Sequence, residues 1–541
     1  MSGVLAGGDL HGAVPGGAEG LGTRPGSGPP DDGGRADQVT PLLRATGWTA
    51  RTDLDEAERG RLHRGRERLA RLVASRPVYG VSRGYGPLVR YGAEPDPFRQ
   101  ADGLLAHLCV GQGPPLPPEV ARTMVWLRLQ SMRLGHSGVD VAVWSALAAQ
   151  WNAGITPRVP QDGSLSASGD LVPLAHAARA AAGDGEVWNG FGATAGAPVP
   201  AADALRRQGL EPVRWDARSA LAFVNGTSAS LAMALHNHDR IRALAEASAA
   251  VTGRLVTLLG AATEAYAERL ALVRGHPGHR LASEWIRSAA GDVVADPARP
   301  LQEPYSLRCA PQVLGAVLDQ VRLQAEVLAT EARGCTDNPV LVGDAVLHGG
   351  NFHAAPVALA VEQQAVCVHQ VAYLAERQLA LVVDPERNGG RPPFLTPRPG
   401  RGSGLAGVQM AATSHLAAIR QAGYPASMTP LPANLDNQDH VPMALNGANA
   451  VRGMLDRAWW IMGSLFVAAH QLSLLGPAGS RRPEPAAPWE WFEQNVPGLL
   501  RDRPLAAEVA AAAEVVERRF GWPSAVPADV TLEGTDGDRT R

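Results

Sequence analysis

The chain contains no lysine, and all 50 of its basic residues are arginine. A pyridoxal phosphate enzyme holds its cofactor through a lysine Schiff base. Walker-A nucleotide sites and protein kinases also need a lysine, which contacts the phosphates. The missing lysine therefore argues against all three classes, and no pyridoxal phosphate is expected.

Cysteine is scarce as well. The 541 residues include four cysteines, at positions 109, 309, 335 and 367, and none lies at metal-ligand spacing from another. This excludes zinc fingers and cysteine-bound clusters, and it predicts buried thiols in a reducing compartment such as the cytoplasm. His348 and His353 have neither an HExxH pattern nor a carboxylate partner, so no metal is expected there.

Long hydrophobic runs and basic stretches are also missing. The most apolar segment, 459–475, contains His470 and Gln471 and is short for a membrane span of about 20 residues, so it predicts a buried core helix. No basic region followed by an apolar run opens the chain, so no secretory signal is expected. No basic stretch is interleaved with aromatic residues, which argues against nucleic acid as a partner. A net charge of −3 is ordinary for a soluble protein.

Most of the chain has the pattern of long helices. After a Gly- and Pro-rich tail at 1–37, which predicts disorder, apolar residues recur at helical spacing among polar ones. Wide apolar faces favour a helical bundle that is buried against other subunits. Helices are expected at 54–74, 117–134, 228–272, 311–333, 354–381 and 446–475.

The most unusual stretch is Gly163–His176, with Ala167-Ser168-Gly169-Asp170 at its centre. Small side chains allow the backbone to fold back on itself, and Gly169 has no Cβ to obstruct its own nitrogen. That nitrogen could attack the Ala167 carbonyl, and loss of water there and from Ser168 would leave an electron-poor five-membered ring. The alternative is an ordinary small-residue turn before a helix that begins at Leu171.

Other segments have the residue types of a site. Tyr79 lies in a glycine-rich loop, 78–87, which is either functional or a surface Ω-loop with its tyrosines packed on itself. Tyr305 and Arg308 precede a strong helix, and arginine suits bidentate binding of a carboxylate, although Arg308 could instead pair with Glu303. Polar clusters at 225–227, 349–353 and 437–440 also precede helices, as caps or as ligand sites.

In this order, the motifs resemble the aromatic ammonia-lyase and aminomutase family, which carries the 4-methylideneimidazole-5-one (MIO) group. The resemblance runs from about Tyr79 to Leu475. It implies a mainly α fold, a long-helix bundle of the ammonia-lyase (fumarase/aspartase-like) type with an N-terminal MIO-bearing domain, and a homotetramer. The implied parts are an N-terminal domain at 38–220, a central bundle at 221–480 and a C-terminal helical segment with a frayed tail at 481–541.

The resemblance also implies roles for single residues. Ala167, Ser168 and Gly169 would form the MIO group, with Asp170 assisting the loss of water. Tyr79 would be the base that removes the β-proton, and such a phenol needs its pKa lowered by a helix N-terminus or an arginine. Arg308 would bind the substrate carboxylate. The remaining implied positions are Tyr305 and Asn225, for the MIO group and the substrate amine, and Gln302, Asn338, Phe352 and Gln438, in the pocket.

Two positions bear on the substrate. His107-Leu108 stands where tyrosine-selective members carry a His-Leu pair, and an imidazole can hydrogen-bond a phenol; the alternative is an ordinary helix histidine. Gln438 stands where histidine ammonia-lyases carry glutamate. Ser82, Arg83 and Tyr85 depart from the usual loop sequence, which puts loop closure and the role of Tyr79 in question.

These observations favour an ammonia-lyase that converts an aromatic L-amino acid, tyrosine-like, to an arylacrylate. One alternative is a 2,3-aminomutase that gives a β-amino acid. Another is an inactive member that acts as a binding scaffold. The fumarase and aspartase group ranks last, because its signature loop includes a lysine.

Overall fold

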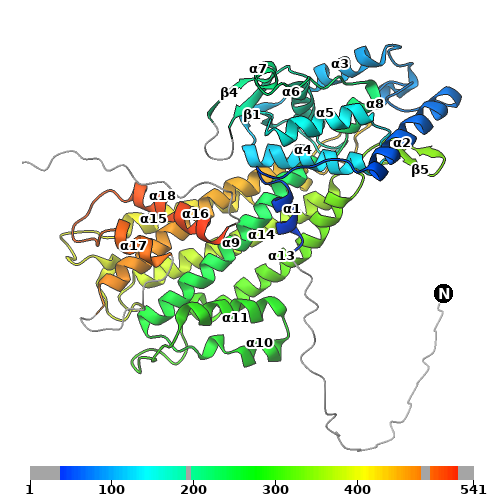
Figure 1. Ribbon diagram of the computed structural model, residues 1–541. Helices are drawn as coiled ribbons and strands as arrows, with labels where there is room; N and C mark the ends of the chain where they lie inside the picture. Colours follow the sequence, from blue (N-terminus) through cyan, green and yellow to red (C-terminus); the bar gives the residue numbers. More distant parts are fainter. Residues whose placement is uncertain (1–36, 191–195, 477–487, 522–541) are drawn as a thin grey trace, which may run out of the picture. The chain divides into compact units, whose positions relative to one another are not determined.

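Four long helices form the centre of the protein. The structure is a computed structural model that describes residues 37–190, 196–476 and 488–521. The central helices pack on one another along their length (Figure 1). They are α9 (Ser228–Leu259), α13 (Ala310–Arg333), α14 (Ala355–Val382) and α16 (Ala444–Leu474).

The predicted helices are largely confirmed. The segments 311–333, 354–381 and 446–475 form α13, α14 and α16, and the apolar stretch from Trp459 is buried within α16. The prediction of one helix over 228–272 was too long. Gly260 adopts a left-handed conformation, with φ of 64°, and ends α9 there, because such a backbone favours glycine and stops a helix.

Shorter helices surround the four central ones. Helices α15 and α18 pack against α16, and α11 packs against α9 and α13. No helix in the described part of the chain is long and apolar enough to cross a membrane. The bounds are α10 (Glu268–Arg274), α11 (Pro277–Ala290), α12 (Tyr305–Arg308), α15 (Ala406–Ala422), α17 (Trp489–Asn495) and α18 (Ala506–Phe520), with 3₁₀ turns η3 (Glu264–Tyr266), η4 (Pro393–Leu395) and η5 (Ala426–Met428).

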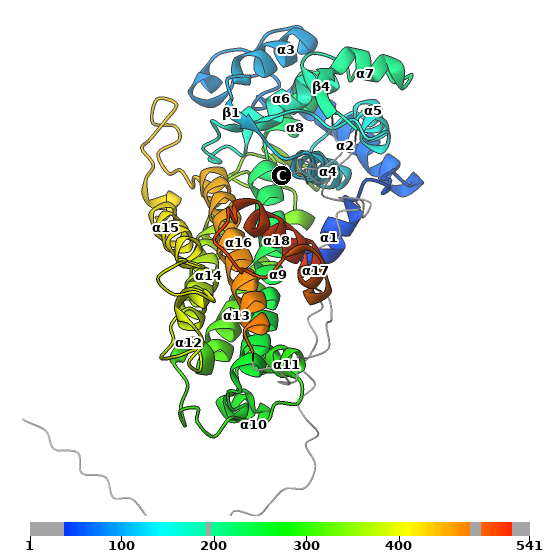
Figure 2. The same cartoon turned by 90° about the vertical axis from the view of Figure 1, so that its left-hand side faces the viewer.

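The N-terminal helices other than α1 gather with the small sheets at one end of the bundle, whereas α1 packs against α9 and α13 (Figure 2). Helix α4 packs along α9 and joins the two parts. The helices are α1 (Val39–Ala45), α2 (Glu56–Ser75), η1 (Gly86–Arg90), α3 (Pro97–Leu108), α4 (Pro118–Arg133), α5 (Val141–Asn152), α6 (Leu171–Ala181), α7 (Ala201–Arg207) and α8 (Ala217–Val224).

Strands are few and short. Three antiparallel pairs are described: β1 (Gln112–Pro115) with β2 (Pro160–Asp162), β3 (Glu186–Asn189) with β4 (Gly196–Pro200), and β5 (Val340–Val342) with β6 (Ala345–Leu347). The mainly α class is therefore confirmed. The boundaries near 220 and 480 stay a prediction, and the expected N-terminal tail and the C-terminal tail from 522 lie outside the described residues.

Candidate active site

The loop that carries Ser168 has a tightly folded backbone. Ser166 and Gly169 have φ values of 57° and 74°. A Cβ on Gly169 would lie 2.3 Å from the Gly226 nitrogen, so glycine alone fits this position. Helix α6 begins directly afterwards at Leu171, as the sequence predicts.

Asp170 is the buried anchor of this loop. Its Oδ1 accepts hydrogen bonds from the Ser164 and Ser166 hydroxyls, at 2.9 and 2.7 Å. Its Oδ2 accepts from the backbone nitrogen and the hydroxyl of Ser230, at 2.7 and 2.9 Å. Burial raises the pKa of Asp170 despite these donors. The three serines are absent from the sequence prediction, because nothing in the spacing links position 230 to position 170.

Two predicted residues hold Ser168 itself. The Asn225 amide donates to the Ser168 carbonyl at 2.7 Å, and the Gln438 amide donates to its hydroxyl at 2.9 Å. The side-chain oxygen of Asn225 is buried and has no hydrogen-bond partner among the described residues. Asn225 is therefore not the N-cap of α9, a position that Thr227 occupies: its amide holds the Ser168 loop, and its oxygen is free for a ligand.

Tyr79, His107 and Leu108 line one cavity of about 880 Å³ together with Ser168, Asn225 and Gln438. The described structure thus brings together six residues from five distant segments of the sequence. The glycine-rich loop also has a feature of the alternative, an Ω-loop whose tyrosines pack on the loop itself. Its two tyrosines, Tyr79 and Tyr85, contact each other edge-on, with 6.3 Å between their ring centroids.

The environment of Tyr79 differs from the expectation. Its hydroxyl accepts a hydrogen bond from the Gly86 nitrogen at 2.8 Å, which favours the charged form. Burial outweighs this bond and raises the pKa of Tyr79. The lowered pKa that a tyrosine base needs is therefore not produced by the described residues of one chain.

The side chain of His107 is set by its own helix. Its Nδ1 lies 3.0 Å from the Gly103 carbonyl one turn earlier. An Nδ1 that donates to this carbonyl leaves Nε2 as an acceptor. Arg83, which departs from the family pattern, does not line the cavity: its guanidinium reaches toward the Arg90 carbonyl at 3.5 Å.

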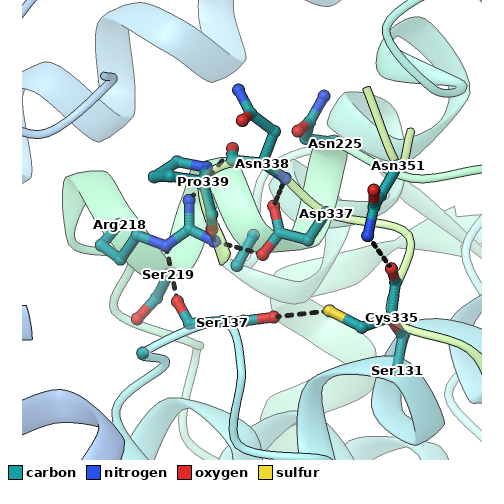
Figure 3. A network of polar contacts seen from close by, with 12 residues as sticks. Ser131, Ser137, Arg218, Ser219, Asn225, Cys335, Asp337, Asn338, Pro339 and Asn351 are labelled. Atoms are coloured by element: carbon teal, nitrogen blue, oxygen red, sulfur yellow. Dashed lines mark hydrogen bonds and ion pairs between the residues drawn. The ribbon is translucent and has the colours of Figure 1, made fainter. Parts of the chain in front are cut away.

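Asn338 and Phe352 do not line the cavity. The Asn338 amide oxygen accepts from the Gly349 nitrogen at 2.8 Å, and its backbone carbonyl accepts from Arg218 at 3.3 Å. Figure 3 shows this network, in which Arg218 is ion-paired with the buried Asp337. Phe352 lies two residues before Ala354, whose backbone nitrogen donates to the Ser166 carbonyl at 3.2 Å. The segment that follows Phe352 therefore contacts the Ser168 loop, whereas Asn338 belongs to the network of Arg218.

Tyr305, Arg308 and Gln302 lie far from Ser168. Near the start of α9, Ser230 forms a hydrogen bond with Asp170 of the Ser168 loop. Further along α9, Thr252 is linked to the segment of Tyr305 and Arg308: the Gln378 amide donates to the Thr252 hydroxyl and to the Ser306 carbonyl, each at 2.8 Å. The 22 residues from Ser230 to Thr252 span about 33 Å of helix. One chain thus does not bring these three residues to the cavity.

The surroundings of Arg308 settle its alternative pairing. The Glu303 carboxylate pairs with Arg299 at 2.6 Å, so the ion pair between Arg308 and Glu303 was the wrong alternative. Arg308 instead donates to the Glu303 carbonyl at 3.3 Å and lies 4.9 Å from the ring centre of Tyr305. Tyr305 is 71% exposed and lines a separate cleft of about 850 Å³. Gln302 is exposed.

The described residues fit an MIO group. The glycine and the left-handed backbone at Ser166 and Gly169 fit a ring formed from Ala167, Ser168 and Gly169, and the amides of Asn225 and Gln438 hold Ser168 from outside it. The four cysteines are free thiols, and the described ranges contain no group of three His, Cys, Asp or Glu side chains that could hold a metal ion.

Comparisons with known proteins place the chain in one family. The profile of the aromatic amino acid lyase family matches residues 35–487. A tyrosine aminomutase from Streptomyces globisporus is 30% identical, with a TM-score of 0.82 over 89% of this chain and 96% of that chain. Phenylalanine aminomutase from Pantoea agglomerans is 25% identical, with a TM-score of 0.81 over 88% and 97% of the two chains.

A third similar structure shares the fold at lower identity. Histidine ammonia-lyase from Trypanosoma cruzi is 24% identical, with a TM-score of 0.78 over 92% of this chain and 98% of that chain. The family match covers most of the sequence and includes both the helical bundle and the Ser168 loop. The chain therefore belongs to the aromatic amino acid lyase family, whose members are ammonia-lyases and aminomutases.

Proposed function

We propose that this chain is an MIO-dependent ammonia-lyase that converts a tyrosine-like L-amino acid to an arylacrylate and ammonia. The observation that carries the proposal is the single cavity shared by Ser168, Asn225, Gln438, Tyr79 and His107. Natural side chains include bases and nucleophiles but no strong electrophile. The MIO group supplies that electrophile, which activates the amine of the substrate as a leaving group.

The chain's own residues bind and orient the substrate. The free oxygen of Asn225 accepts a hydrogen from the substrate amine. Tyr79 takes the β-proton at its hydroxyl oxygen. The Nε2 of His107 accepts the hydrogen bond of a phenol, and a site that contains this acceptor disfavours a substrate without the hydroxyl.

The missing carboxylate-binding side comes from a second copy of the chain in this proposal. Tyr305, Arg308 and Gln302 of one copy complete the cavity of another within a homotetramer. Exposed apolar residues support such an assembly: Leu359, Val366 and Tyr373 recur every seven residues along α14, so they form one stripe on the helix surface. We place the protein in the cytoplasm, in line with its free thiols.

A 2,3-aminomutase is the second candidate, and the likeness to a tyrosine aminomutase favours it. Incubation with L-tyrosine separates the two activities. The lyase releases coumarate and ammonia, whereas the aminomutase forms β-tyrosine. Ser168→Ala is the control, because it cannot form the exocyclic methylene of the MIO group.

The mass of the intact chain tests the enzyme proposal independently of substrate. MIO formation removes two water molecules. A chain with the unmodified mass and no product from any aromatic amino acid contradicts both enzyme candidates and leaves the binding scaffold.

A further inference from the structure

Arg128 on α4 is a buried cation with no counter-ion in contact. Its side chain is fully buried, and among the described residues no carboxylate lies within ion-pair distance of it. One of its terminal nitrogens donates to the Thr336 hydroxyl at 3.0 Å, and the other donates to the Ala222 carbonyl. Its Nε is buried without a partner. A buried charge is costly unless other groups stabilise it, so this placement needs an explanation.

The guanidinium lies directly against the backbone that supports the Ser168 loop. A Cβ on Gly226 would be 1.9 Å from Nη1 of Arg128. A Cβ on Gly169 would be 2.3 Å from the nitrogen of the same Gly226. Gly226 is therefore in contact with Arg128 and with Gly169, and it separates them by a single residue.

Asp170 is close to the same residue. Its backbone nitrogen donates to the Gly226 carbonyl at 2.7 Å. Asp170 is fully buried, and its four hydrogen-bond donors are neutral hydroxyls and a backbone amide. The neighbouring buried cation, Arg218, is already ion-paired with Asp337. Asp337 is thus the carboxylate that acts most strongly on Arg128, and Asp170 is a second carboxylate that its charge reaches and that has no ion pair among the described residues.

We propose that Arg128 is a positioning residue for formation of the MIO group: it holds Gly226 against Gly169 and stabilises the Asp170 carboxylate across that residue. This inference rests on the proposed MIO chemistry. The carboxylate of Asp170 takes up protons during ring closure and returns them to the departing water.

The step balances without any co-reactant. A bond forms between the Gly169 nitrogen and the Ala167 carbonyl carbon. The first water takes the Ala167 oxygen and the hydrogens of the Gly169 and Ser168 nitrogens. The second takes the Ser168 hydroxyl and the hydrogen of its Cα.

Arg122, six residues earlier on α4, gives a matched control. It is 1% exposed, and its Nε, Nη1 and Nη2 donate to the backbone carbonyls of Thr46, Trp151 and Gly47 at 2.8–3.1 Å. Arg122→Met therefore removes a buried arginine from the same helix as Arg128, at a position that contacts neither Gly226 nor Asp170. A purely structural role predicts the same outcome for both arginines.

The test is the intact mass of full-length Arg128→Met, Arg128→Lys and Arg122→Met chains, followed over time after cell-free synthesis. Loss of a neighbouring opposite charge makes the ionised form of a buried carboxyl less favourable by about one pKa unit or more, so we expect Arg128→Met to lose water about 10-fold more slowly or worse. We expect Arg128→Lys to recover part of this rate and Arg122→Met to lose water at the wild-type rate, with comparable helical circular dichroism.

Each other outcome has a definite meaning. Equal rates of water loss in Arg128→Met and wild type overturn the role of Arg128, and so do equal losses of rate in both arginine variants. If Arg128→Met does not fold, Thr336→Val decides, since it removes the hydroxyl that orients Arg128: a wild-type rate there overturns the proposal. A wild-type chain that never loses water contradicts the proposed function itself.

Discussion

The distance between the two halves of the proposed site leads to a quantitative prediction. The α9 residues that anchor the segments of Ser168 and Arg308, Ser230 and Thr252, are about 33 Å apart along the helix, whereas reacting groups must approach within about 3.5 Å. If two copies build each site, Ser168 comes from one chain and Arg308 from another. Chains with Ser168→Ala and chains with Arg308→Met are then each inactive alone but complement each other.

The expected activity follows from random assembly. In tetramers formed from equal amounts of both variants, one site in four receives wild-type Ser168 and wild-type Arg308, so co-expressed chains regain about a quarter of the wild-type activity. The variants carry different affinity tags, and two successive purifications isolate the mixed assemblies. The assay is product formation from the aromatic amino acid that the wild type accepts.

The control uses two changes in the same half of the site. Ser168→Ala and Asn225→Ala lie on one side of the cavity, since Asn225 contacts Ser168 directly. Activity is restored to about a quarter only when the paired changes lie on opposite halves. Mixed assemblies without activity, or an active monomer at high dilution, would refute the reasoning.

Three further predictions concern single side chains. His107→Phe removes the proposed acceptor for the phenol, so the ratio of kcat/KM for tyrosine over phenylalanine falls about 10-fold or more; an unchanged ratio means that His107 is an ordinary helix histidine. Gly226→Ala inserts a Cβ 1.9 Å from Arg128, which lowers the free energy of unfolding by about 1–3 kcal/mol or more in chemical denaturation, whereas Gly407→Ala, in open space on α15, does not destabilise. Burial lowers the pKa of His238, so below about pH 6.5 the unfolded state binds a proton that the folded state does not, and stability falls. His238→Gln should therefore flatten the dependence of Tm on pH. The same change at the exposed His63 is the control and should leave that dependence unchanged.

Local patterns in the sequence predict the helices well, because the long helices have wide apolar faces and clear end signals. The end of α9 is the exception. Apolar residues continue at helical spacing past Gly260, and only its left-handed backbone reveals that the helix stops there. The spacing of apolar residues indicates which face of a helix is buried, but it does not indicate where the helix ends.

The candidate site was predictable wherever a residue type carries the chemistry. The chemistry of the loop around Ser168 could be proposed from its own small residues, whereas the roles of Tyr79 and His107 came from the resemblance to a family. Ser230 and Arg128 could not be found in this way, because a serine or an arginine within a helix has many ordinary roles. Their contacts with Asp170 and Gly226 arise only when distant segments fold together.

The raised pKa of Tyr79 connects the chemistry to the proposed assembly. A buried phenol whose pKa is above its usual value stays protonated at neutral pH and is a poor acceptor for a β-proton. The Gly86 nitrogen is a single neutral donor and does not offset the burial. A nearby cation would lower this pKa, and Arg308 of a second copy would supply one. On this reasoning, assembly both completes the carboxylate site and activates the base. Arg308→Met should therefore shift the acidic, rising limb of the pH–rate profile to higher pH, because a base with a higher pKa loses its proton at higher pH, whereas a change in KM alone would confine Arg308 to substrate binding.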